Sequence, residues 1–250
     1  MITFEVCCGS YSDAAAAERG GASRVELNSA LSLGGLTPDI GGVYRCKEEL
    51  KIPVIAMLRP RAGGFCYTKE EYKTMRKTAE CLLSAGADGL AFGFLTEKRE
   101  IDVERTGEIT ELAHSLGKEA VFHRAFDCTN SFGAAADQLI ASGVDRILTS
   151  GGERTALLGW ECLRKLEESV GSRIQILAGS GVRSANVAEL LEKTGVRQVH
   201  SSCRGYVEDR TARGNGVAFD CEGAPQWYCC EAVTEMEVQK MSRSLARYGM

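Results

Sequence analysis

A short phrase recurs along the chain and constrains its fold more than any other feature. It consists of a glycine, one to three residues, a charged or polar residue, and then an apolar stretch. The copies are Gly21-Ala-Ser-Arg-Val-Glu-Leu, Gly86-Ala-Asp-Gly-Leu-Ala-Phe, Gly143-Val-Asp-Arg-Ile-Leu-Thr and Gly195-Val-Arg-Gln-Val-His-Ser. Each follows a helical segment, and its glycine stands where the end of a helix favours a left-handed residue. The phrase therefore marks a repeated passage from a helix into a strand.

Eight short apolar segments are predicted as strands. They cover residues 3–8, 24–28, 53–59, 90–94, 120–127 (the strand and its polar end), 146–150, 174–179 and 198–202. Helices are expected between them, including one of 13–19 capped by Ser12, one opened by a capping box at Thr68, and others at about 131–141, 155–170 and 184–194. Eight such units that close on themselves predict a (βα)8 TIM-type barrel.

The whole chain, residues 1–250, is expected to form one domain, with the barrel core at about 3–203 and a C-terminal extension at 204–250. The extension is predicted to be irregular to about residue 228 and helical over 231–248, and it could cover the barrel mouth or form a subunit contact. An open doubly wound sheet is the alternative fold. Such a sheet would carry a phosphate fingerprint after its first strand, and Cys7-Cys-Gly-Ser contains no G-x-G-x-x-G.

Charge and composition exclude several classes of partner. The formal net charge is −4, which leaves no basic surface for nucleic acid or membranes. No apolar run reaches the roughly 18 residues of a membrane span, and the first residues lack the features of a signal peptide. We therefore expect a cytoplasmic protein, in which most of the 11 cysteines are buried thiols.

The functional site of such a barrel is built from side chains at the C-terminal ends of its strands. Strand alternation places Glu5 and Glu26 in the lumen, because their neighbours are large and apolar. Buried carboxylates need cationic partners, for which Arg59, His123 and His200 are the candidates. This set could be a structural ion-pair network or could carry acid-base chemistry. As catalytic residues we predict Glu5, Glu26, His123 and His200.

Substrate-binding residues are predicted from the same strand ends and their loops. Arginine forks suit carboxylate or phosphate groups, so the Gly-bearing loop with Arg59 and Arg61 is expected to hold a small anion. The loop Ala178-Gly-Ser-Gly-Val182 could bind phosphate or could simply allow close packing. The predicted binding residues are Arg59, Arg61, Thr149, Ser180, Ser202 and Asn28.

No local spacing marks a metal site, but several strands supply possible ligands. Copper(I) favours soft donors, which here are Cys7 and Met57. The third histidine, His114, lies in a predicted helix and is expected at the surface. Arg124 and Asp127 are close enough in sequence to pair.

Several stretches resemble the CutC family, which is named for copper homeostasis. They are Glu5-Val-Cys, Gly20-Gly-Ala-Ser-Arg-Val-Glu-Leu27, Gly34-Gly-Leu-Thr-Pro38, Arg59-Pro-Arg61, Phe122-His-Arg-Ala-Phe-Asp127, Arg146-Ile-Leu-Thr-Ser-Gly151 and Gly181-Val, and together they cover about residues 4–202. The resemblance implies a TIM-type barrel, a cytoplasmic location, a link to copper and a homodimer or homotetramer.

The chain departs from the family pattern in ways that suggest a diverged member or paralogue. Asn28 stands where the family commonly has a cysteine that is suggested to take copper(I), and Arg59-Pro-Arg-Ala-Gly-Gly-Phe65 lacks the acidic residue usual before the phenylalanine. Two functions remain open. One is copper(I) binding, and the other is an isomerase, epimerase or lyase that acts on a small anionic substrate by Glu/His chemistry.

Overall fold

Eight parallel strands close into a barrel in the computed structural model, which describes residues 1–221 and 223–249. The strands are β1 (Thr3–Cys8), β2 (Arg24–Leu27), β3 (Val54–Met57), β4 (Gly89–Phe92), β5 (Glu119–Phe122), β6 (Arg146–Thr149), β7 (Gln175–Ala178) and β8 (Gln198–Ser201). They follow one another in chain order, and β1 pairs with β8 to complete the ring. The predicted (βα)8 barrel is confirmed.

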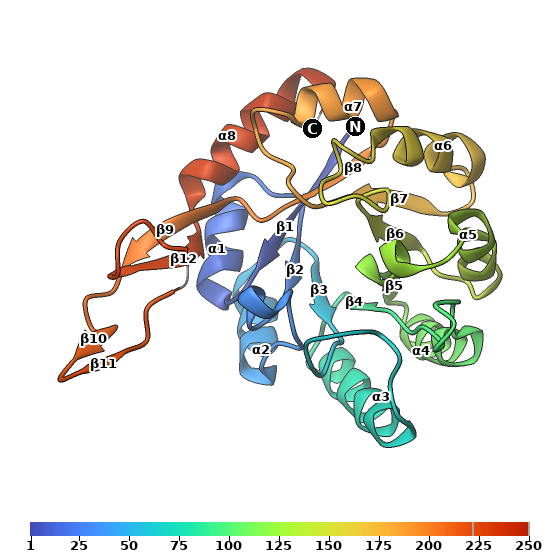
Figure 1. Ribbon diagram of the computed structural model, residues 1–250, viewed down its shortest axis with the longest axis horizontal. Coiled ribbons are helices and arrows are strands. Elements are labelled where there is room, and N and C mark those ends of the chain that lie inside the picture. The colour runs from blue at the N-terminus through green and yellow to red at the C-terminus, as the bar shows by residue number, and fades with distance from the viewer. Residues whose placement is uncertain (222, 250) are drawn as a thin grey trace.

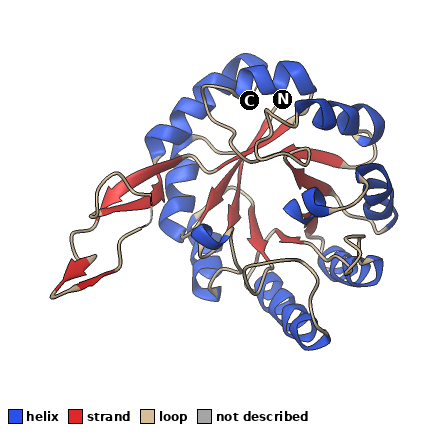
Figure 2. Cartoon of the chain, viewed as in Figure 1, coloured by secondary structure: helices blue, strands red, loops and turns tan. Residues whose placement is uncertain are grey.

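Helices surround the barrel on its outer side (Figure 2). They are α1 (Tyr11–Gly20), α2 (Ile40–Glu49), α3 (Lys69–Ser84), α4 (Val103–Ser115), α5 (Phe132–Ala141), α6 (Trp160–Val170) and α7 (Val187–Thr194), with short 3-10 turns η1 (Leu31–Leu33) and η2 (Arg124–Cys128). The main core lies between the strands and these helices. A separate apolar cluster of Ile55, Met57, Ala91 and Val121 packs apart from that core. By strand alternation these four side chains face the lumen.

Local sequence signals explain most helix ends. The glycines of the four recurring phrases all have positive φ, from 73° at Gly195 to 98° at Gly86, as expected after a helix. The Thr68 capping box is present, with Glu71 as its second member. Helix α1, however, is capped by Ser10 and not by Ser12, because Ser10 is the residue with an extended backbone and its side chain accepts from the Asp13 N–H.

Two predicted helices begin later than expected. Helix α6 starts at Trp160 instead of about 155, because the chain after β6 folds back so closely that a Cβ on Gly159 would lie 2.0 Å from the Ser150 carbonyl oxygen. Helix α7 starts at Val187, after a turn in which the Asn186 side chain accepts from the Arg183 N–H.

The C-terminal extension is more regular than predicted. Strands β9 (Arg204–Glu208) and β12 (Cys229–Val233) pair antiparallel, and β10 (Arg213–Gly214) pairs with β11 (Val217–Ala218). We call residues 204–221 and 223–233 the arm; it projects sideways from the barrel and does not cross its mouth (Figure 1). Helix α8 (Glu235–Leu245) packs beside α1, and η3 (Ala246–Tyr248) follows it. None of the helices in the described residues is long and apolar enough to span a membrane.

Candidate functional site

Three potential metal ligands meet inside the barrel where β1, β2 and β8 adjoin. Phe4, Val6 and Cys8 are fully buried in the outer core, so alternation turns Cys7 inward. One ligand atom from each of Cys7, Glu26 and His200 lies within 4.8 Å of the others. The Cys7 Sγ is 3.8 Å from Oε2 of Glu26, to which it donates. A soft thiol, an imidazole and a carboxylate are thus held together by three different strands.

Glu5 supports this trio from within the barrel wall. Its Oε1 is 2.8 Å from Nδ1 of His200, and its Oε2 accepts from the Arg24 Nε at 2.5 Å. Arg24 also donates to the Gln198 side chain at 3.0 Å. The expected cationic partners of Glu5 were Arg59 and the histidines; His200 fulfils this expectation, but the guanidinium is that of Arg24. Arg24 shares the face of Glu26 on β2, and that alternation is the signal that could have identified it.

The charges in this cluster depend on each other. Burial alone would raise the pKa of Glu5, but the Arg24 guanidinium and His200 hold it well below its usual range. Burial opposes protonation of His200, yet its contacts with Cys7, Glu5 and Glu26 raise its pKa well above the ordinary value. Burial raises the pKa values of the Cys7 thiol and of the Glu26 carboxyl. Glu5, Arg24 and His200 therefore form a charged triad. Beside it lie the Glu26 carboxyl and the Cys7 thiol, whose raised pKa values favour their protonated forms.

Asn28 lies beside Cys7 and Glu26 and contacts both. Its Nδ2 donates to Oε2 of Glu26 at 2.8 Å and approaches the Cys7 Sγ at 3.5 Å. Its Oδ1 is buried with no hydrogen-bond partner in the part of the chain that the structure describes. The residue predicted to bind substrate thus lies directly against Cys7 and Glu26.

His123 lies in a different environment, against residues that follow β3 and β4. Its Nδ1 accepts from the Ala125 N–H at 3.1 Å, and its ring lies 5.0 Å from that of Phe65. A Cβ on Gly93 would lie 2.5 Å from this ring, so only glycine fits beneath it. Burial and the charge of Arg59 lower the pKa of His123 to about 3. This neutral imidazole makes no ion pair with the buried carboxylates, in contrast to the expected pairing.

The two arginines of the predicted anion loop bind the protein itself. Arg59 donates from Nη1 to the carbonyls of Leu33 and Gly35 and from Nη2 to that of Gly63, each at 3.0 Å. Arg61 pairs with Glu71, with 2.5 Å between its Nε and Oε1. Neither terminal fork is open to a ligand in this arrangement.

The other predicted site residues are dispersed. Met57 belongs to the apolar cluster with Ile55, Ala91 and Val121. The Thr149 hydroxyl donates to Asp127, and the Ser180 hydroxyl donates to the Arg154 carbonyl. The Ser202 hydroxyl accepts from Arg183 at 3.3 Å.

Asp127 makes more structural contacts than the sequence predicted. It pairs with Arg124 as expected, with 2.8 Å between Oδ2 and Nε. It also accepts from the Thr149 hydroxyl and from the Ser150 and Gly152 backbone N–H groups. Asp127 therefore ties the turn after β5 to the loop after β6. His114 is exposed, as expected, with its Nε2 2.8 Å from Asp145.

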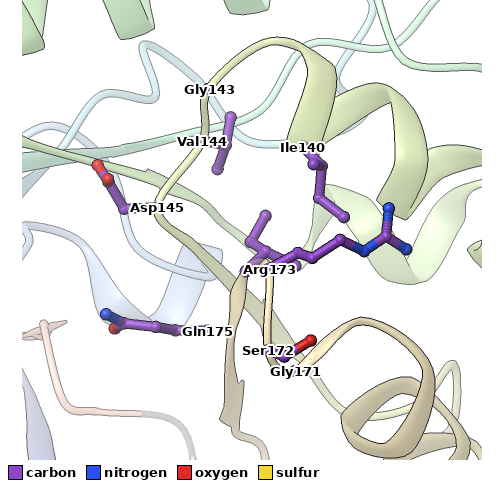
Figure 3. Close-up of a pocket in the computed structure, with 9 residues that line it drawn as sticks. Ile140, Gly143, Val144, Asp145, Gly171, Ser172, Arg173 and Gln175 are labelled. Carbon is purple, nitrogen blue, oxygen red and sulfur yellow. The ribbon is translucent and has the colours of Figure 1, made fainter.

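A hollow lies at the opposite end of the barrel, in the loops that precede β6 and β7 (Figure 3). The Asp145 carboxylate beside it is already bonded to His114 and to the Ala120 N–H, and Arg173 pairs with Asp137. We assign no function to this hollow.

Comparison with known proteins identifies clear relatives. The CutC family profile matches residues 2–205. A family protein CutC from Treponema denticola is 44% identical over 214 residues, which cover 86% of each chain. A solved structure from Streptococcus agalactiae, provisionally named a copper homeostasis protein CutC, superposes with a TM-score of 0.76 at 32% identity over 81% of this chain and 99% of that one. A thiamine phosphate pyrophosphorylase from Pyrococcus furiosus, with 15% identity and a TM-score of 0.59, covers 100% of this chain and 98% of its own and shares the fold alone.

Proposed function

Because this chain belongs to the CutC family, a family associated with copper homeostasis, we propose that it binds copper(I) through Cys7 and His200, with Glu26 as a weaker third ligand. The observation that carries this proposal is the approach of the three ligand atoms to within 4.8 Å of one another. Copper(I) prefers soft donors, so the thiolate of Cys7 would be its principal ligand.

The surroundings of His200 suit a metal ligand. Its Nδ1 is engaged by Glu5, and copper(I) would replace the proton that the charged ring carries on its other nitrogen. Metal-binding histidines usually make such a contact to a carboxylate, because it fixes the ring orientation and the tautomer. Glu5 would act as this support and Arg24 would hold Glu5 in turn.

Met57 remains a candidate ligand, because its thioether is soft and it is predicted to line the lumen. It packs in a cluster with Ile55, Ala91 and Val121, so its contribution is expected to be smaller than that of Cys7. Met57→Leu should weaken copper(I) binding less than Cys7→Ser does.

An anaerobic copper(I) titration against a chromogenic competing chelator tests the proposal. Cys7→Ser should lose the tightest class of site, with affinity reduced about 100-fold or more, because the principal soft donor is gone. Cys81→Ser is the matched control, since that thiol is exposed on α3 and lies outside the barrel. Equal affinity in wild type and Cys7→Ser would refute the proposal.

Zinc provides a second test, because thiolate, imidazole and carboxylate are also zinc ligands. We expect copper(I) to displace zinc(II) from the site that depends on Cys7. If zinc binds there and copper(I) does not, the copper function is wrong although the metal site is real.

The proposed location is the cytoplasm, since copper(I) and free thiols both require a reducing compartment. All 11 cysteines are free thiols in the structure. Recovery of the native protein with any of them oxidised to a disulfide would oppose this location. The isomerase or lyase alternative is less well supported, because Glu5, one of its predicted catalytic residues, is bonded to both Arg24 and His200.

A further inference from the structure

Arg59 is a buried cation whose charge is not balanced by a carboxylate. Its exposed fraction is 7%, and its terminal nitrogens donate only to carbonyl oxygens. The other two buried arginines differ, since Arg24 pairs with Glu5 and Arg146 pairs with Glu119. No Asp or Glu of the described chain forms such a pair with Arg59. An uncompensated buried charge is costly, so a negative partner would stabilise this region.

Three buried polar atoms near this charge have no hydrogen-bond partner within the described residues: Arg59 Nε, the Tyr67 hydroxyl and His123 Nε2. Nδ1 of His123 accepts from the Ala125 N–H, so the neutral ring carries its proton on Nε2. The three groups can therefore all donate. Each residue is at least nine-tenths buried, with exposed fractions of 7%, 4% and 3%.

Phe65 links these groups in space. Its ring lies 5.3 Å from the guanidinium carbon of Arg59 and 5.0 Å from the ring of His123. Tyr67 lies two residues further along the same segment, where the charge of Arg59 opposes the rise in its pKa that burial causes. Arg59 and His123 thus lie against one aromatic ring, and Tyr67 lies close to the charge of Arg59.

We propose that Arg59, Tyr67 and His123 bind an oxygen atom of a small oxyanion, a carboxylate or a phosphate, beneath Phe65. Three donors and one positive charge complement an oxyanion, because charge-assisted hydrogen bonds are stronger than neutral ones. A neutral carbonyl ligand would leave the charge of Arg59 unbalanced.

The segment that carries Phe65 is suited to admit such a ligand. Gly63 and Gly64 precede it, and a Cβ on Gly64 would meet no atom within 4 Å. Phe65 is only half-buried, whereas the three unpaired polar atoms are fully buried. Rotation of the Phe65 side chain alone would open the pocket and would leave the hydrogen bonds to the Gly63 and Gly64 carbonyls in place.

This oxyanion pocket is separate from the proposed copper ligands. Its residues lie in the segments that follow β3 and β5, whereas the copper ligands lie on β1, β2 and β8. Oxyanion binding should therefore persist in Cys7→Ser, so the two proposals can fail independently.

Calorimetric titration of the full chain at low ionic strength, with inorganic phosphate and with pyruvate as separate probes, tests the pocket and distinguishes the two oxyanion sources. At least one probe should bind saturably in the millimolar range or tighter. Tyr67→Phe removes one donor and should weaken that binding about tenfold. Tyr72→Phe is the matched control, since its hydroxyl bonds to Glu108 at the surface, and it should change affinity less than twofold.

Thermal unfolding without ligand provides a second measurement. The Tyr67 hydroxyl is buried and unpaired, so Tyr67→Phe should keep or raise Tm, whereas loss of a structural hydrogen bond would lower it. Absence of saturable binding by both probes, equal binding by Tyr67→Phe and Tyr72→Phe, or a lower Tm in Tyr67→Phe would each overturn the proposal.

Discussion

At the scale of single residues, Asn28 determines how soft the proposed copper site is. It follows β2, and its side chain contacts Cys7 and Glu26. Asn28→Cys would place a second thiol beside Cys7 and remove an amide that binds Glu26. Because copper(I) favours sulfur, we expect copper(I) affinity to rise about tenfold or more, as measured by anaerobic chelator competition.

Asn28→Ser serves as the control, since it shortens the side chain without adding sulfur. Its copper(I) affinity should not exceed that of the wild type. Equal affinity of Asn28→Cys and Asn28→Ser would show that position 28 does not reach the ion.

His123 should make stability depend on pH in the acid range. Its pKa in the folded protein is about 3, lowered by burial and by the charge of Arg59, whereas an unfolded histidine titrates near 6.5. Its contribution to stability is therefore complete above about pH 6.5 and is lost as pH falls toward about 3. Over that window the folding constant should fall about tenfold per pH unit from this residue alone.

Denaturant unfolding of wild type and His123→Gln between pH 4 and pH 7 measures this contribution. The stability difference between the two proteins should shrink as pH falls. His114→Gln, at an exposed histidine, should retain the wild-type slope. A pH-independent difference for His123→Gln would contradict the assigned neutral state.

At the scale of elements, the sequence predicted those helix ends that depend only on neighbouring residues. The Thr68 capping box and the glycines after the helices act within one turn of chain, so their residues alone identify them. The late start of α6 depends on the close backbone approach of Gly159 to Ser150, which no short segment reveals. The sequence of the arm predicts irregular structure because its strands are short and its glycines numerous.

In the candidate site, too, the features that depend on a single strand were predictable, and those that depend on contacts between segments were not. Alternation along β1 and β2 predicted that Glu5 and Glu26 share the lumen, since that property belongs to each strand by itself. The pairing of Glu5 with Arg24 depends on the register between strands, in which Arg24 lies opposite Glu5. The placement of His123 beside Phe65 depends on a loop conformation, and sequence alone does not determine one.

The arm should be dispensable for the barrel beyond its base. Asp209 and Tyr228 are joined by a backbone hydrogen bond of 2.7 Å at the end of the β9–β12 pair. Replacement of residues 210–227 by Asn-Gly would close this pair with a two-residue turn. We expect Tm to change by less than about 3 °C in a calorimetric scan, because no large side chain from residues 210–221 or 223–227 belongs to the barrel core.

A substitution at the base of the arm, where the arm meets the barrel, should be more destabilising than loss of its outer part. The Val233 N–H donates to Asp13 of α1 at 2.9 Å, and Val233 is part of the core. Val233→Ala should lower Tm by several degrees. A larger loss from the 210–227 replacement than from Val233→Ala would show that the outer arm supports the fold.

At the scale of the whole molecule, Glu5 joins the first and last strands of the barrel. It contacts Arg24 on β2 and His200 on β8, so its carboxylate links β1 to both neighbouring strands. Glu5→Gln would leave two buried cations without their counterion. We expect a loss of about 3 kcal/mol of unfolding free energy and a Tm lower by roughly 10 °C, measured by denaturant and thermal unfolding.

Glu97→Gln makes the same chemical change at an exposed position and should move Tm by less than about 1 °C. If Glu5→Gln is as stable as Glu97→Gln, the lumenal ion pairs contribute nothing to closure of the barrel.

The same contact has a consequence for how the protein is made. His200 and Glu5 are 195 positions apart, and α8, which packs on α1, comes later still. During synthesis β1 therefore emerges from the ribosome long before the strand that completes its pairing. The Glu5 carboxylate and the Cys7 thiol therefore lack their contacts with β8 until nearly the whole chain has been translated. A slow final closure step, sensitive to mutations at Glu5 and His200, is the expected signature of this delay.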